Sequence, residues 1–304
     1  MPITNHRRTK SFGVNPAVLE RTALRTIDFC IDGLRQREIW GVLTVPEKIT
    51  GPPIIMAHGF LGFKDWSFFP WLSQFFALDG FPTIRFNFSG SGMGPQVDGP
   101  FENLEAFQND TISKQVEDLR SVIFSVTQGK LEPDLSAQKR IFLWGHSRGG
   151  AVCLLSATNS PQVQAVATWS SIARVNRYLY EAKQTWRKQG FTAIESSRTG
   201  QLLKSSVDFL DDVEQWGKQG DVPTFLHHLK IPVFLIHGAE DTSVLPDESE
   251  SLAAIYPQAR LAILAGANHK FNSDHPFTQP SEVLIQAAQK TLDFYRDISL
   301  TATE

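Results

Sequence analysis

The stretch Phe142-Leu143-Trp144-Gly145-His146-Ser147-Arg148-Gly149-Gly150 decides how the rest of this chain is interpreted. An apolar run ends in a Gly-x-Ser-x-Gly pattern, and a run of small and apolar residues, 151–155, follows directly. The order strand, sharp turn, helix is the context in which Gly-x-Ser-x-Gly marks a nucleophile elbow. The pattern alone also fits a serine in an ordinary strand-to-helix turn. The choice depends on whether an acid and a histidine follow at the ends of later strands.

Short apolar runs alternate with helical patterns on both sides of this stretch. The runs that predict strands are 54–57, 82–88, 141–144, 163–169, 232–237 and 260–264. Before them, two alternating segments flank Asp32-Gly33 and predict an antiparallel hairpin. This alternation predicts an α/β fold, with a doubly wound, mostly parallel sheet and the hairpin at its N-terminal edge. In such sheets, functional residues collect beyond the carboxyl ends of the strands.

Three parts of the chain differ in pattern. Residues 1–20 are polar and irregular and predict an N-terminal arm, whereas 21–171 and 226–304 carry the alternating pattern of the core. Between these two core segments, 172–225 interrupts the alternation with helical steps and predicts a helical cap insertion. Within it, Ser196 to Gln201 is interpreted as a loop between helices.

Composition narrows the class of protein. The chain has 304 residues, 41% of them hydrophobic and 20% charged, and a net charge of −3. That charge gives no footprint for nucleic acid, and no window approaches the ~20 apolar residues of a membrane span. Two cysteines cannot build a disulfide framework, and the first residues lack the apolar core of a signal peptide. We therefore expect a cytoplasmic protein; the sequence says nothing of its oligomeric state.

An acid and a histidine do follow the serine. Asp241 comes directly after the predicted strand 232–237, and His269 comes after the next one. The chain order Ser147, Asp241, His269 is the order of a hydrolase triad, with serine as nucleophile, histidine as base and aspartate as its orienting acid. Glu240 adjoins Asp241 and is the alternative acid. The histidines show no metal-ligand spacing, so we expect neither a metal nor an organic cofactor.

With these motifs, the chain over roughly 25–298 resembles the α/β-hydrolase superfamily. The segments around His58, Ser147, Asp241 and His269 are most similar to serine esterases of the cinnamoyl/feruloyl esterase and dienelactone-hydrolase-like branch. The resemblance implies an oxyanion hole built from the backbone N–H groups of Phe60 and of Arg148, the residue after the nucleophile. It also gives His58 and His146 structural roles.

The expected activity is hydrolysis of a small-molecule carboxylic ester through an acyl-enzyme. An acyl-aminoacyl-type peptidase or amidase is the near alternative, and a non-catalytic binding protein with a hydrolase fold is the distant one. Relatives carry an acidic residue and an arginine after the strand at Ile84, where this chain has Asn87-Phe88-Ser89-Gly90. The missing charges put a contact with a substrate carboxylate or a peptide terminus in doubt there.

The insertion is rich in aromatic residues. Tyr178, Trp186 and Trp216 could face the serine and form an apolar substrate pocket, or could pack the cap helices together. Both interpretations stay open at this stage.

Overall fold

The structure is a computed structural model, and it describes residues 24–33, 36–136 and 139–301. Its main feature is an eight-stranded sheet with the order β1-β2-β4-β3-β5-β6-β9-β10. The strands are β1 (Leu24–Asp32), β2 (Glu38–Pro46), β3 (Ile54–Ala57), β4 (Thr83–Phe86), β5 (Ile141–His146), β6 (Val163–Trp169), β9 (Val233–Gly238) and β10 (Arg260–Leu264). The arm predicted for 1–20 lies outside the described residues.

Strand direction follows the sequence pattern. β1 and β2 pair in antiparallel fashion, and Gly33 N donates to Arg37 O (2.7 Å) where the hairpin closes. β2 is also antiparallel to β4. The strands β3, β4, β5, β6, β9 and β10 all run parallel to one another. The predicted mostly parallel sheet with an N-terminal antiparallel hairpin is therefore confirmed.

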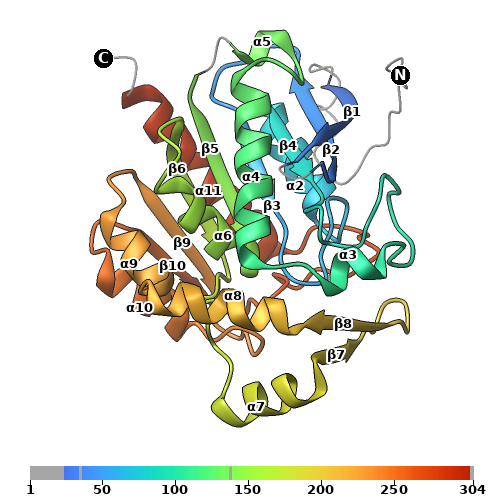
Figure 1. Ribbon diagram of the computed structural model, residues 1–304. Helices are drawn as coiled ribbons and strands as arrows, with labels where there is room; N and C mark the ends of the chain where they lie inside the picture. The colour runs from blue at the N-terminus through green and yellow to red at the C-terminus, as the bar shows by residue number, and fades with distance from the viewer. Residues whose placement is uncertain (1–23, 34–35, 137–138, 302–304) are drawn as a thin grey trace.

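Helices cover both faces of the sheet (Figure 1). On one face pack α4 (Ile112–Thr127), α6 (Arg148–Ala157) and α9 (Asp221–His228); on the other pack α2 (Phe69–Leu78) and α11 (Glu282–Thr301). The buried strands supply both cores by alternation, since Ile54 and Met56 face α2 and α11 while Ile55 and Ala57 face α4 and α6. The remaining helices of the core are α3 (Leu104–Gln108), α5 (Pro133–Ser136) and α10 (Asp247–Ile255). None of the described helices combines the length and apolar character needed to cross a bilayer.

The insertion between β6 and β9 lies below the carboxyl ends of the strands in Figure 1. Besides α9 it contains α7 (Tyr180–Gln189), β7 (Phe191–Glu195), β8 (Leu202–Ser206) and α8 (Val207–Lys218). The β7–β8 hairpin corrects part of the sequence prediction, which gave helices joined by a loop at Ser196 to Gln201. That segment is the hairpin turn. The ribbon is isolated from the main sheet and β7 is largely exposed, so its residues show no inside–outside alternation that would mark a strand.

The hairpin turn is attached to the core. Arg198 pairs with Asp98 (2.8 Å), and its guanidinium lies 4.9 Å from the centre of the Phe63 ring. The Gln201 side-chain amide accepts from Phe101 N (2.7 Å) and donates to Phe101 O (2.9 Å). These contacts fix the insertion over the edge of the sheet where the parallel strands end.

Tyr295 attaches α11 to β5 of the sheet. Its ring is fully buried, stacks on Phe142 (centroids 4.7 Å apart) and donates its hydroxyl to Leu143 O (2.7 Å). We expect Tyr295→Phe to lower the free energy of unfolding by about 1–2 kcal/mol, because a buried hydrogen bond is lost while the packing stays. Urea titration followed by circular dichroism measures this change.

The matched control is Tyr180→Phe, because the side chain of Tyr180 is 70% exposed. It should change the free energy of unfolding by less than about 0.5 kcal/mol. Equal effects of the two substitutions would contradict a structural role for the Tyr295 hydroxyl.

Candidate active site

The turn between β5 and α6 holds Ser147 in a backbone conformation that an L-residue rarely adopts, with φ 57° and ψ −123°. Close backbone contacts surround it. A Cβ on Gly145 would lie 2.4 Å from Gly149 O, and a Cβ on Gly149 would lie 2.4 Å from Ala57 O. Both glycines are therefore required by space, and the turn presents the serine at the edge of the sheet.

Asp241 and His269 meet at the same edge. They follow β9 and β10, and His269 Nδ1 lies 2.7 Å from Asp241 Oδ2. Since a carboxylate only accepts, His269 Nδ1 carries the proton and its Nε2 is left as a base. Glu240, the alternative acid, is exposed and holds neither histidine.

The Asp241 carboxylate is buried and fully used. Its Oδ1 accepts from the backbone N–H groups of Ser243 and Val244 (both 2.9 Å), and its Oδ2 also lies 3.2 Å from His237 Nε2. Burial by itself acts to raise the pKa of Asp241, but the hydrogen bonds from His237, His269 and Val244 outweigh it and hold the pKa well below its usual value. The group is thus a fixed negative charge beside His269.

His146 joins the elbow to the loop that carries His269. Its Nε2 donates to His269 O (2.8 Å), and the two rings lie 4.8 Å apart. Among the described residues, Ser147 Oγ makes no hydrogen bond with His269. A proton transfer between them therefore requires the two side chains to close up when a substrate binds, as is common in unliganded sites.

Two backbone N–H groups beside Ser147 have no acceptor within the described part of the chain. They are those of Phe60 and Arg148. The loop of Phe60 approaches the serine closely, because a Cβ on Gly59 would lie only 2.9 Å from Ser147 Cβ. His58 holds this loop: its Nδ1 donates to Gly59 O (2.9 Å) and its Nε2 accepts from Phe88 N (3.2 Å). Two amides without an acceptor thus belong to the two backbone segments that adjoin Ser147.

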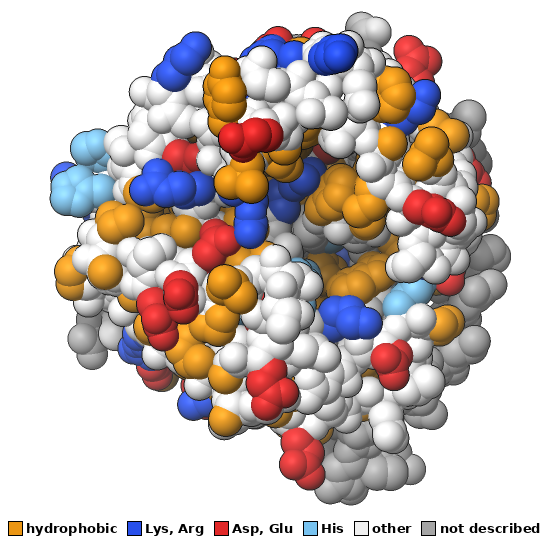
Figure 2. Space-filling view, turned by 90° about the horizontal axis from the view of Figure 1, so that it is seen from below, with side chains coloured by type: hydrophobic (Ala, Val, Ile, Leu, Met, Phe, Trp, Pro, Cys, Tyr) orange, Lys and Arg blue, Asp and Glu red, His pale blue; other side chains and the backbone are white. Residues whose placement is uncertain are grey.

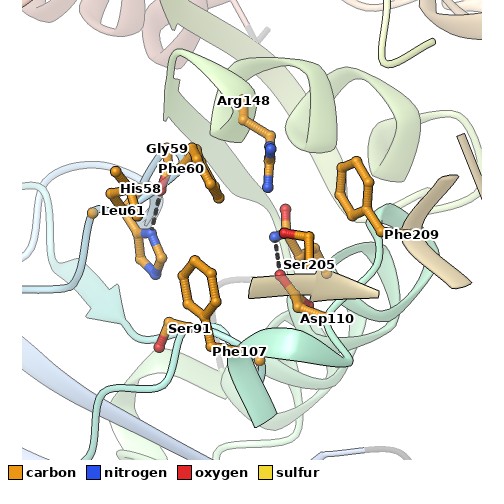
Figure 3. A pocket seen from close by; sticks show the side chains of 13 residues that line it. His58, Gly59, Phe60, Leu61, Ser91, Phe107, Asp110, Arg148, Ser205 and Phe209 are labelled. Atoms are coloured by element: carbon orange, nitrogen blue, oxygen red, sulfur yellow. Dashed lines mark hydrogen bonds between the residues drawn. The ribbon is translucent and has the colours of Figure 1, made fainter. Parts of the chain in front are cut away.

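The face below the strands is hollowed, with hydrophobic side chains in its floor and Lys, Arg and His side chains at its rim (Figure 2). A pocket of about 350 Å³ of empty space, its open mouth included, begins at His58 and Gly59. Arg148 projects into it between Phe60 and Phe209, opposite Phe107 and Asp110 (Figure 3). It is lined by His58, Gly59, Phe60, Leu61, Gly62, Gly90, Ser91, Phe107, Asp110, Gln115, Arg148, Ser205 and Phe209.

The three aromatic residues that the sequence offered for the substrate are not in that lining. Trp186 is buried, stacks on Phe209 (5.9 Å) and donates its Nε1–H to Ser205 O (3.0 Å), and Tyr178 packs edge-on against it. Trp216 packs against Phe225 and donates to Ser113 Oγ (3.1 Å). Their helical spacing reflects packing inside the insertion, and two residues they help to hold, Ser205 and Phe209, face the pocket.

Sequence reasoning missed several residues of this site. His237 lies only four residues before Asp241, but a histidine at a strand end has many roles, so its position alone did not indicate a contact with the acid. Asp110 precedes α4 and meets Arg148 through the tertiary fold alone. Among residues 24–33, 36–136 and 139–301, no three His, Cys, Asp or Glu side chains gather closely enough to hold a metal ion.

A comparison with known protein families agrees with this fold and elbow. The sequence profile of the alpha/beta hydrolase family matches residues 54–287. The chain belongs to the alpha/beta hydrolase family. The matched residues run from β3 into α11 and include the elbow, Asp241 and His269.

Individual relatives are distant. The acetyl esterase Axe7A of Xylanibacter ruminicola is 23% identical over 260 residues, 81% of this chain and 55% of that protein. The thiohydrolase aneE of Aspergillus aculeatus is 29% identical over 148 residues, 48% of this chain and 41% of that protein. The chain thus spans about half the length of these curated relatives. Est1E of Butyrivibrio proteoclasticus, solved with ferulic acid bound, has a TM-score of 0.68 at 19% identity, over 88% of this chain and 98% of its own, which shows a shared fold.

Two buried histidines and a buried aspartate near the site have opposite effects on how the free energy of unfolding changes with pH. Burial lowers the pKa of His58 to about 4 and that of His146 to about 3, so unfolding is favoured as pH falls below about 6.5. Burial raises the pKa of Asp118 to about 7, although hydrogen bonds from Ser89 act to lower it. The folded protein thus holds a proton on Asp118 that the unfolded chain has lost, and this term lowers stability as pH rises from about 4 to 7.

Replacement of Asp118 removes the loss of stability that this carboxyl causes as pH rises. It leaves the gain of stability that His58 and His146 cause over the same pH range. We expect Asp118→Asn to make the free energy of unfolding rise more steeply between pH 4.5 and 6.5, by about 1.4 kcal/mol per pH unit. Urea titrations at pH 4.5, 5.5 and 6.5 measure the slope. His146→Gln should shift the slope in the opposite direction, and identical slopes in wild type and Asp118→Asn would refute the assignment.

Proposed function

We propose that the protein is a serine hydrolase that cleaves carboxylic esters of small molecules through an acyl-enzyme. The observation that carries the proposal is the 2.7 Å hydrogen bond between His269 and the buried Asp241, at the sheet edge where the elbow presents Ser147. A serine hydroxyl needs an adjacent base, and a histidine held in one tautomer by an ionised acid is such a base.

The reaction follows from these groups. Ser147 Oγ attacks the ester carbonyl while His269 Nε2 takes its proton, and Asp241 stabilises the imidazolium that forms. The negative charge that develops on the carbonyl oxygen is accepted by the unpaired amides of Phe60 and Arg148. His269 then returns the proton to the departing alcohol, and water hydrolyses the acyl-enzyme by the same steps.

The choice of esters over amides rests on the relatives. Axe7A is an acetyl esterase by name, and its alignment with this protein covers 81% of this chain. After β4, where relatives carry an acidic residue and an arginine, the segment Asn87 to Gly92 of this chain carries no charged residue. An aminoacyl amidase is the outcome against which the proposal is tested.

A fluorophosphonate probe and a substrate series test the proposal together. Wild type should be labelled and should hydrolyse 4-nitrophenyl esters faster than aminoacyl 4-nitroanilides. Ser147→Ala should lose labelling and reduce kcat by about 10⁶-fold, as loss of a serine nucleophile does elsewhere.

Ser121→Ala is the matched control and should leave both readouts unchanged, because Ser121 lies on α4 and its hydroxyl donates to Glu117 O (3.1 Å). Labelling that survives Ser147→Ala would refute the nucleophile. Faster cleavage of anilides than of esters would instead assign the protein to amidases, and a folded wild type without labelling or turnover would indicate a binding protein.

Asp241→Asn tests the tautomer directly. Because Asp241 Oδ1 accepts two backbone N–H groups, the asparagine oxygen is expected to take that place and turn its NH₂ group toward His269. His269 would then accept at Nδ1 and carry its proton on Nε2, where it cannot receive the serine proton. We expect kcat to fall about 10⁴-fold.

Glu240→Gln is the matched control for this change, because the exposed neighbour holds neither histidine. It should stay within about threefold of wild type. A comparable loss in both variants would show that the loop as a whole, and not the Asp241 hydrogen bond, sets the rate.

A further inference from the structure

The pocket beside Ser147 contains polar groups that the protein leaves unused. Asp110 Oδ1 and Gln115 Oε1 are buried there and have no hydrogen-bond partner among the described residues. Gln115 Nε2 donates to Asp110 Oδ2 (2.5 Å), which fixes the orientation of the amide and leaves its oxygen as an acceptor. A buried acceptor without a donor costs free energy. Two such acceptors side by side therefore indicate that a bound ligand supplies the hydrogen-bond donor.

A cation faces these acceptors. The Arg148 guanidinium lies 4.2 Å from the centre of the Phe60 ring and 4.9 Å from that of Phe209, so its position is fixed by two aromatic faces. Within the described residues it forms no ion pair or hydrogen bond, although it is near enough to Asp110 to act on the pKa of that carboxyl. The pocket therefore presents free donors on one side and free acceptors on the other (Figure 3).

The position of the pocket says which half of an ester enters it. Phe60 and Arg148, whose amides are proposed to bind the oxyanion, line the pocket, and so does Gly59, which adjoins Ser147; Ser147 and His269 themselves do not line it. The leaving alcohol has to face His269, from which it receives its proton. The pocket is thus on the acyl side, a step that rests on the proposed function.

Charge and hydrogen-bond count select among acyl substituents. A carboxylate would pair with Arg148 but offers no donor to Asp110 or Gln115 and would be repelled by Asp110. An ammonium group would satisfy the acceptors but would be repelled by Arg148. A hydroxyl both donates and accepts, and it adds no charge to a site that already balances one cation with one carboxylate.

We propose that this pocket selects esters whose short acyl group carries a hydroxyl, with Asp110 and Gln115 accepting from it and Arg148 donating to it. The enclosed part of the pocket has a volume of about 20 Å³, which admits one group of the size of a hydroxyl or a water molecule. The hydroxyl end of a short acyl chain enters this space, and the apolar body of the chain lies at the open mouth, against the rings of Phe60, Phe107 and Phe209.

The test holds the leaving group constant and changes one acyl atom group. The 4-nitrophenyl esters of 2- and 3-hydroxybutanoate are compared with their isosteres, the 2- and 3-methyl analogues, at pH 8, where Asp110 is ionised because its pKa, raised by burial, is about 6. In wild type, kcat/KM for at least one hydroxy ester should exceed that of its methyl isostere by about 10-fold or more. The ratio should fall to about one in Asp110→Ala and in Arg148→Met.

Asp118→Asn is the matched control, because Asp118 is also a buried carboxyl of raised pKa but lies outside the pocket; its ratio should equal that of wild type. Taking the ratio within each variant removes any general loss of activity. Arg148→Met keeps the test valid should Asp110→Ala fail to fold.

Other outcomes overturn the inference in distinguishable ways. Efficient cleavage of butanoate without preference for a hydroxyl would refute the hydroxyacyl pocket and leave the esterase intact. Preference for the hemisuccinate or the 4-aminobutanoate ester would assign the pocket to an anion or a cation instead. Absence of both phosphonate labelling and ester turnover in wild type would refute the proposed function and, with it, the acyl assignment.

Discussion

The close approach of backbone to backbone at the elbow is the constraint on which the site depends. Gly149 packs against Ala57 O and Gly145 against Gly149 O, so β3, β5 and α6 meet without side chains between them. This contact holds Ser147 at φ 57°, and it also brings Gly59 next to the serine. The same packing therefore exposes a hydroxyl and sets two unpaired amides beside it.

Asp241 is the second centre of the site, because it orients His269. Buried Asp241 receives hydrogen bonds from two amides and two histidines, so its charge is fixed, and His146 ties the loop of His269 back to the elbow. Neutral buried histidines, His58 and His146, position both loops without taking part in proton transfer at neutral pH. The loop of the proposed base and the loop of Phe60 are thus each held by a buried histidine.

The sequence predicted the sheet, its hairpin edge and the residues at the strand ends, because these depend on local patterns of apolar residues and glycine. It missed the β7–β8 ribbon, whose exposed residues show no alternation, and it offered Tyr178, Trp186 and Trp216 for a pocket they do not line. It also missed His237, which is four residues before Asp241 but at a position with many possible roles, and Asp110, which meets Arg148 only through the tertiary fold. Helical spacing cannot distinguish a residue that packs two helices from one that faces a cavity.

The most direct measurement of the central claim is a crystal structure of the protein after reaction with a small alkyl fluorophosphonate. The account predicts phosphorus bonded to Ser147 Oγ, with the phosphoryl oxygen about 2.7–3.1 Å from the amide nitrogens of both Phe60 and Arg148. Phosphorus on another residue, or a phosphoryl oxygen directed away from both amides, would contradict it.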